Sequence, residues 1–288
     1  MTSRLPCPRF PGGTADVVSP GRCEDGREWS GGVGVSRDEV TGRLRAAGCV
    51  FAEDEAALLL GEAGEDPVRL ERMLTARVSG FPLEQVLGWA WFRGVRIAVA
   101  PGVFVPRRRT EHLVELAVEG LGAGAVVVDV CCGSGAVAAA VRAERPDAVV
   151  WACDVDERAT VCAELNLPGG HVVTGDLFAP LPRALAGRVR VITANAPYVP
   201  SDAVALMPPE ARDHEPRTAL DGGSDGLSVQ ARVIAQARDW LAPGGVLLVE
   251  TSREQAERTA GLMGAAGLAA RVSRCDELDA TVVSGRWG

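Results

Sequence analysis

The second half of the chain repeats one pattern, in which a short apolar run is followed by a turn and a helix. Five of these runs predict buried strands, at residues 126–130, 148–154, 171–174, 189–194 and 246–250. Helices are predicted between them, at residues 133–145, 157–166 and 227–241. Parallel strands need a long crossover connection, and a helix of this length supplies one. The alternation therefore predicts an α/β fold built on a parallel sheet.

The first part of the chain has a different character. Residues 1–36 are rich in Gly, Pro and Ser with little periodic apolar signal, which predicts a disordered extension. Ser36 is a candidate N-cap, and Glu39 follows at the spacing of a capping box. Short amphipathic helices are then predicted, at residues 37–47, 53–63 and 67–79. We expect a small helical domain at 37–88.

A connecting region follows this helical domain. Residues 89–99 read as two short strands around Arg93-Gly94, which predicts a β-hairpin. Residues 89–106 are expected to link the helical domain to the α/β domain at 107–288, and the first helix of that domain is expected at 109–120.

Charge and composition narrow the classes of function. The 38 acidic residues outnumber the 30 basic ones, which argues against a nucleic-acid binder despite the local run Arg107-Arg108-Arg109. None of the eight cysteines forms a CxxC pair and the three histidines are scattered, so no metal site is predicted. No apolar run reaches the roughly 18 residues that span a bilayer, and no secretory signal is recognised. We expect a cytoplasmic protein with free thiols and no membrane partner.

A glycine-containing turn follows the first strand of the α/β domain and predicts a ligand site. The strand ends in Asp129-Val130, and the turn continues through Cys131, Cys132, Gly133, Ser134 and Gly135. Ligands of open α/β sheets bind at the carboxyl ends of strands, where glycines let the backbone approach them closely. Asp154 ends the second strand, where its carboxylate would accept hydrogen bonds from both ribose hydroxyls. These features favour an adenosine-containing cofactor over a simple turn and leave nicotinamide and S-adenosylmethionine cofactors open.

Three further residues are candidates for the same site. Asp129 would orient the turn or meet the amino group of a methionine moiety, and bracing of the turn is the alternative. Asp176 and Leu177 follow the third strand and would face the adenine from the other side, or else form a turn.

The fourth strand leads into Asn195-Ala196-Pro197-Tyr198, a candidate acceptor site. A planar amide nitrogen is a poor nucleophile, because its lone pair is delocalised. Carbonyl groups of the Asn195 side chain and of the Ala196 or Pro197 main chain would bind both of its N–H groups and aim it at an electrophile. Pro197 limits backbone freedom, and Tyr198 would form a wall of the pocket. We expect Asn195, Pro197 and Tyr198 to carry the catalytic role; an Asn-initiated turn is the alternative.

In the order of these motifs the chain resembles the HemK/PrmC-type glutamine N5-methyltransferases that modify peptide chain release factors. The resemblance covers roughly residues 40 to 285. The tetrapeptide of that family is Asn-Pro-Pro-Tyr. Residues 105–111 are similar to the family's Pro-Arg-Pro-x-Thr-Glu, and residues 215–227 to its Glu-Pro…Ala-Leu…Gly-Gly-x-Asp-Gly-Leu.

This resemblance implies a class I, Rossmann-like methyltransferase fold with a mostly parallel sheet and one antiparallel strand. It implies that the N-terminal helical domain helps to grip a protein substrate, a release factor. It places the acceptor glutamine on Asn195, Ala196, Pro197 and Tyr198. It places S-adenosylmethionine on Cys131, Cys132, Gly133, Ser134, Gly135, Asp154, Leu177 and Asn195.

The chain departs from the family pattern at three places. Ala196 replaces the first proline of the tetrapeptide, Cys131 stands where the first glycine of the loop would be, and Arg108-Arg109 replaces a proline and an acidic residue. These departures leave other acceptors open: another protein glutamine, a small-molecule nitrogen, or, less favoured by the acidic balance, a nucleic-acid adenine. A cofactor-binding module without activity is a further alternative.

Two other groups invite a chemical role. Cys131 and Cys132 are interpreted as small buried side chains, because no histidine near them in sequence would activate a thiol. His214 lies between two acidic residues and is interpreted as a loop histidine, with an acid–base role as the alternative.

Overall fold

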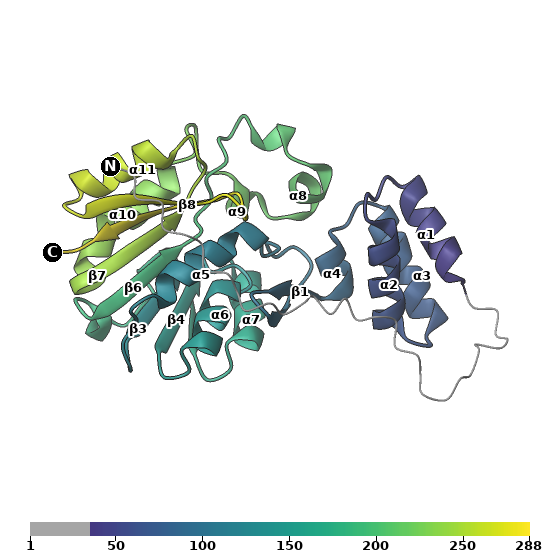
Figure 1. The fold of residues 1–288 in the computed structure, drawn as a ribbon, viewed down its shortest axis with the longest axis horizontal. Helices are drawn as coiled ribbons and strands as arrows, with labels where there is room; N and C mark the ends of the chain where they lie inside the picture. Colours follow the sequence, from purple (N-terminus) through teal and green to yellow (C-terminus); the bar gives the residue numbers. More distant parts are fainter. Residues whose placement is uncertain (1–34) are drawn as a thin grey trace.

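The computed structural model describes residues 35–288 (Figure 1). The extension expected at 1–36 lies outside the described residues, except for Val35 and Ser36. The α/β part is centred on a seven-stranded sheet in the order β5-β4-β3-β6-β7-β9-β8. Its strands are β3 (Val126–Val130), β4 (Val149–Asp154), β5 (His171–Thr174), β6 (Val189–Ala194), β7 (Leu241–Glu250), β8 (Ala269–Cys275) and β9 (Ala280–Arg286).

Strand direction matches the predicted fold class. β3 pairs in parallel with β4 and β6, β4 with β5, and β6 with β7. β9 is antiparallel to both of its neighbours, β7 and β8. A single strand therefore runs against the other six, and the expectation of a mostly parallel class I sheet with one antiparallel strand is confirmed.

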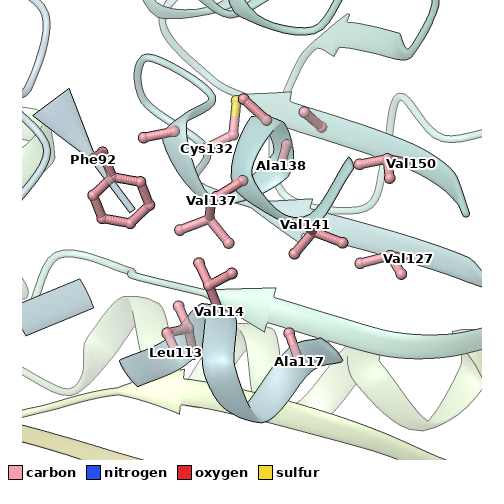
Figure 2. Close-up of a cluster of buried hydrophobic side chains, with 14 of the residues drawn as sticks. Phe92, Leu113, Val114, Ala117, Val127, Cys132, Val137, Ala138, Val141 and Val150 are labelled. Atoms are coloured by element: carbon pink, nitrogen blue, oxygen red, sulfur yellow. The ribbon is translucent and has the colours of Figure 1, made fainter. Parts of the chain in front are cut away.

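Helices cover both faces of this sheet and create two hydrophobic layers. One layer lies under α5 (Glu111–Val118), α6 (Ala136–Glu144) and α7 (Glu157–Asn166). The other lies under α10 (Ser228–Trp240) and α11 (Ala256–Ala265). Adjacent β3 residues alternate between them, with Val127 in the first layer and Val128 in the second. Figure 2 shows side chains of α5 and α6 packed toward one another in the first layer.

Several elements differ from the sequence prediction. The helix expected from residue 133 begins at Ala136, because Gly133 and Gly135 adopt left-handed φ angles of 54° and 75° in the preceding turn. β7 extends back to Leu241, and its pairing with β6 shifts register between Val189 and Val191, opposite Pro243-Gly244-Gly245. The C-terminal α11, β8 and β9 were not predicted. Nor were three short helices, α4 (Leu83–Leu87), α8 (Pro209–His214) and α9 (Arg217–Leu220).

The N-terminal helices α1 (Arg37–Ala46), α2 (Ala52–Ala63) and α3 (Pro67–Val78) lie to one side of the sheet (Figure 1). The Ser36 hydroxyl accepts a hydrogen bond from the Glu39 N–H at 3.2 Å, so the predicted N-cap is present. Val40, Leu44, Leu59 and Leu74 belong to a core cluster separate from the two sheet layers. Across residues 35–288 no helix is both long and apolar enough to cross a membrane.

The predicted hairpin joins these helices to the sheet. It consists of β1 (Trp89–Phe92) and β2 (Val95–Ala98), which pair antiparallel. Arg93 and Gly94 both have positive φ angles, 47° and 74°, as a two-residue turn between twisted strands requires.

Arg77 ties the N-terminal helices together and to the α/β part. Its buried guanidinium donates to both carboxylate oxygens of Glu55, at 2.6 and 3.0 Å, and to Glu210 of α8 at 2.6 Å. Replacing Arg77 by Ala leaves the Glu55 carboxylate buried without a charged partner, so we expect the free energy of unfolding to fall by about 3 kcal/mol in urea denaturation. The control is Arg43→Ala, which removes only an exposed pair with Glu71 and is expected to cost under about 1 kcal/mol. Equal losses would contradict the bracing role.

Candidate active site

A cavity of about 380 Å³ opens at the carboxyl ends of β3, β4 and β6. β3 lies between β4 and β6, so the chain leaves it in one direction and later returns on its other side. Such a switch point is where open α/β sheets bind ligands. Most of the predicted cofactor residues line the cavity: Asp129, Cys131, Cys132, Gly133, Ser134, Asp154, Asp176, Leu177 and Asn195.

The turn after β3 is held by the carboxylate of Asp154 at the end of β4. Gly133 N–H donates to Asp154 Oδ2 at 2.9 Å, and Asp156 N–H donates to Oδ1 at 3.0 Å. Burial raises the pKa of Asp154, while these backbone donors act in the opposite direction. Each carboxylate oxygen has a second lone pair, so Asp154 can also accept hydrogen bonds from a ligand in the cavity.

Gly135 is the one predicted cofactor residue that does not line the cavity. It has a φ of 75° and is the N-cap residue of α6. A Cβ atom at this position would lie 2.9 Å from the Cβ of Ala163 in α7. The glycine therefore allows α6 and α7 to approach closely. Cys131 also has a left-handed φ, 58°, which a glycine adopts more easily than a residue with a Cβ atom.

Asp129 lies at the floor of the cavity with only 2% of its surface exposed. Its Oδ1 accepts a hydrogen bond from the Thr193 hydroxyl at 2.8 Å. Its Oδ2 is buried and has no partner of good hydrogen-bond geometry within residues 35–288, although the Ala138 N–H is near enough to the carboxyl to lower its pKa. A buried carboxylate oxygen without a partner is a natural site for a cationic group of a ligand.

The pKa of Asp129 predicts a pH dependence of stability. Burial raises this pKa from 3.8 to about 7, although the Thr193 hydrogen bond opposes the rise. Between these values the folded protein keeps a proton that the unfolded chain has released, so the free energy of unfolding falls as pH rises through the window. We expect Asp129→Asn to flatten this fall when urea denaturation without cofactor is compared at about pH 4.5 and about pH 7.5.

A matched control isolates this effect. Asp213 is an exposed carboxyl whose pKa Arg212 lowers, so Asp213→Asn is not expected to flatten the slope. Burial also raises the pKa of Asp154, Glu215 and Glu250, and these groups contribute to the slope that remains in the Asp129→Asn variant. A slope identical to that of the unchanged protein would contradict the assignment to Asp129.

The predicted tetrapeptide follows β6 directly and forms another wall of the cavity. Asn195 is half-buried, and its Nδ2 donates to the Thr110 hydroxyl at 3.3 Å. Ala196 and Pro197 are buried. The Tyr198 hydroxyl donates to Glu250 at 3.4 Å, and burial raises the pKa of this phenol well above its ordinary value. The tetrapeptide therefore adjoins the cofactor turn across one cavity.

The glycine-rich run after α9 packs directly on the backbone of the tetrapeptide. A Cβ atom on Gly222 would lie 2.6 Å from the Pro197 carbonyl oxygen and 2.8 Å from the Tyr198 Cα. Gln255 adds a hydrogen bond from its Nε2 to the Tyr198 carbonyl at 3.0 Å. Glycine at 222 thus lets two segments distant in sequence lie backbone to backbone.

We expect Gly222→Ala to lower turnover about tenfold, because the added methyl group displaces the Pro197 carbonyl and small misplacements near reacting groups are costly. Steady-state kinetics with saturating cofactor measure this. Gly264→Ala in α11 adds the same methyl group where nothing lies within 4 Å, and it is expected to leave turnover unchanged. Unchanged turnover in the Gly222→Ala variant would contradict the proposal that the glycine-rich run after α9 braces the tetrapeptide.

The segment 99–107 covers one side of the cavity and is anchored at two points. Glu215 accepts from the Val105 N–H at 3.1 Å and pairs with Arg107 through both carboxylate oxygens at 2.7 Å. Gln85 of α4 donates to the Val103 carbonyl at 3.0 Å. Arg107 is thus engaged by an acidic partner, and the segment is tied to the N-terminal helices.

Some residues of the site were not identified from the sequence. Phe104 and Thr110 line the cavity, and Glu250 stands directly behind Thr110 and Tyr198. The sequence contained a signal that could have identified Glu250, since this residue is a carboxylate at the carboxyl end of an apolar strand. His214 does not line the cavity; its ring lies 4.1 Å from that of Phe81. No cluster of side chains suited to a metal ion occurs in residues 35–288.

This arrangement combines a cradle for an adenosine cofactor with carbonyl groups for an amide. Asp154 provides acceptors for hydroxyl groups, and Asp129 provides a site for a cation. The Asn195 side-chain carbonyl and the Pro197 main-chain carbonyl are groups that can accept hydrogen bonds from N–H groups. The cavity can therefore bring an electrophilic cofactor and a planar nitrogen together.

Comparison with known proteins identifies the family. The Methyltransferase small domain family matches residues 94–206. The release factor glutamine methyltransferase of Mycolicibacterium smegmatis is 37% identical over 242 residues, 77% of this chain and 85% of that protein. That of Gloeobacter violaceus is 42% identical over 182 residues, and the match spans 60% of this chain and 63% of that protein.

A solved structure of a methyltransferase has a similar fold. A crystal structure of a methyltransferase from Pyrococcus furiosus superposes with a TM-score of 0.51 over 68% of this chain and 90% of that chain, at 16% identity. The curated relatives confirm the resemblance inferred from the motifs. The chain belongs to the release factor glutamine methyltransferase family and is a class I methyltransferase that uses S-adenosylmethionine as its methyl donor.

Proposed function

We propose that the protein methylates the side-chain amide nitrogen (N5) of a glutamine in a peptide chain release factor, the glutamine of its Gly-Gly-Gln sequence. The observation that carries this proposal is the position of Asn195, whose side-chain amide lies in the wall of the cavity that also contains the cofactor turn. The names of the relatives support the choice of release factor.

The residues around the cavity fit S-adenosylmethionine. Asp154 suits the two ribose hydroxyls, and the unpartnered Oδ2 of Asp129 suits the methionine ammonium group. Leu177 and Asp176 line the same cavity, and Asp176 lies at its exposed rim, paired with Arg232. When bound, the cofactor supplies an electrophilic methyl group on a sulfonium.

The protein's own part in the reaction is to hold the acceptor. The Asn195 side-chain carbonyl and the Ala196 or Pro197 main-chain carbonyl accept hydrogen bonds from the two N–H groups of the glutamine amide. This fixes the orientation of the nitrogen and favours the positive charge that develops on it. Tyr198 walls the pocket. The methylated nitrogen gives up its proton readily, so no general base is required.

The domain organisation follows from the same proposal. Residues 37–88 act as a recognition domain for the protein substrate, residues 89–106 connect it to the enzyme, and residues 107–288 form the methyltransferase domain. The reaction takes place in the cytoplasm, where release factors act. Support comes from Arg77 and Gln85, which connect the helices to α8 and to the segment covering the cavity.

The test is transfer of labelled methyl groups to a purified release factor. We expect label in the unchanged release factor and none in a variant whose Gly-Gly-Gln glutamine is replaced by alanine. Mass spectrometry of the labelled peptide then locates the methyl group. Label that enters the glutamine-less variant equally would show that the proposed acceptor is wrong.

A further inference from the structure

A buried carboxylate lies behind the acceptor wall of the cavity. Glu250 ends β7 and is only 1% exposed. Its Oε1 accepts from the Tyr198 hydroxyl at 3.4 Å and from Arg109 Nε at 3.4 Å. Its Oε2 is buried and lacks a partner of good hydrogen-bond geometry within residues 35–288. Glu250 is not itself part of the cavity wall, so it acts only through the side chains in front of it.

Thr110 connects this carboxylate to Asn195. The Thr110 side chain is buried, and its hydroxyl oxygen accepts from Asn195 Nδ2 at 3.3 Å. The same hydroxyl lies close enough to Glu250 to lower the pKa of that carboxyl, against the rise that burial causes. The Thr110 hydroxyl is therefore available as a donor to the Glu250 carboxylate.

The hydrogen bonds that link Glu250, Thr110 and Asn195 fix which group donates and which accepts at each step. A carboxylate only accepts hydrogen bonds, so the Thr110 proton points to Glu250. The Thr110 oxygen is then left to accept, and the partner that it faces must be the NH₂ end of the Asn195 amide. The carbonyl end of that amide is consequently turned away from Thr110. The opposite orientation would place a donor against the N–H groups of an acceptor amide.

We propose that Thr110 and Glu250 are positioning residues that fix which end of the Asn195 side-chain amide faces the acceptor. Glu250 also accepts a hydrogen bond from Tyr198. One buried carboxylate thus positions both ends of the tetrapeptide. The inference rests on the proposed function in that it assigns the acceptor as an amide whose N–H groups need the Asn195 carbonyl.

The first test is a double-mutant cycle on methyl transfer to the release factor. Thr110→Val keeps the shape of the side chain and removes the hydroxyl; we expect kcat to fall about 30-fold, with the cofactor Kd within about threefold of the unchanged enzyme. Thr110→Ser restores the hydroxyl and is expected to recover most of kcat. In an Asn195→Ala background, Thr110→Val is expected to change kcat by less than about threefold, because the group it orients is gone.

The cycle separates positioning from a general structural effect. A fall of equal size in both backgrounds, or an equal loss in the Val and Ser variants, would overturn the role through Asn195. Glu250→Gln preserves volume but presents an amide that can donate, so it no longer fixes the direction of the Thr110 proton. We expect at least about a tenfold loss of kcat, and full activity would overturn the role of the carboxylate.

The second test does not depend on turnover. In NMR spectra the side-chain NH₂ signals of Asn195, assigned by their loss in Asn195→Ala, are expected to exchange slowly with solvent. Thr110→Val should accelerate this exchange and Thr110→Ser should not; identical exchange in the Val variant overturns the inference. An unchanged enzyme that fails to label the release factor would instead refute the proposed function, and the exchange measurement would still decide the orientation of Asn195.

Discussion

Replacing Asn195 by alanine is expected to lower kcat about 10³-fold while the Kd of S-adenosylmethionine stays within about threefold. The side chain supplies an oriented acceptor to the glutamine amide, and a preorganised polar group of this kind acts mainly on the transition state. Its only hydrogen bond to the rest of the described chain is to Thr110, so its loss leaves the cofactor turn intact.

Two measurements check this prediction: steady-state kinetics with the release factor and calorimetric titration with the cofactor. Far-ultraviolet circular dichroism and a melting curve confirm that the variant folds. Equal losses of turnover and of cofactor affinity would assign Asn195 to cofactor binding alone and would contradict its role toward the acceptor.

Replacing Asp154 by alanine is expected to have the opposite signature, a rise of about 10²- to 10³-fold in the cofactor Kd. Two hydrogen bonds from ribose hydroxyls to a carboxylate contribute roughly 1.5 kcal/mol or more each. The variant also removes the acceptor for the Gly133 and Asp156 N–H groups, which loosens the turn that receives the cofactor. At saturating cofactor we expect kcat to change little.

The matched control is Asp176→Ala. This carboxylate lines the same cavity, but it is exposed and paired with Arg232, so we expect its loss to raise the Kd less than about tenfold. Titration calorimetry compares the two variants. An Asp154→Ala variant that binds cofactor as tightly as the unchanged enzyme would exclude the ribose contact.

The central strands could be predicted because their amino-acid composition strongly favours a strand over a helix. The runs at 126–130 and 189–194 coincide with the central strands β3 and β6 to the residue, and the run at 171–174 coincides with β5, an edge strand. They are rich in β-branched residues, and turns bound them. β8 is different: most of its residues are exposed or half-buried, and it includes Ala, Arg and Ser. An edge strand of this kind is defined by its pairing with β9, which a linear pattern does not reveal.

The residues of the candidate site also fall into two groups, those that the sequence identified and those that only the fold brings together. Residues 129–135 and 195–198 were identified because each set is contiguous and follows a recognisable strand. Thr110 lies 85 residues from Asn195, and Glu250 lies 52 residues from Tyr198. Glu250 lies near Tyr198 because β6 and β7 are neighbours in the sheet, and Thr110 lies near Asn195 because it precedes α5, which packs against these two strands. Gly222 was noticed only as part of a motif, because its contact with Pro197 depends on the folded backbone.

The pairing of Glu250 with Val282 of β9 also has a consequence for the order in which the molecule is assembled during synthesis. Domains of a growing chain begin to fold before the chain is finished. The cofactor turn and the tetrapeptide both precede residue 200, so their strands can pair early. β7 gains its outer neighbour only after residues 280–286 have left the ribosome. The segments that hold the methyl donor are therefore synthesised before the strand that fixes the buried carboxylate behind the acceptor.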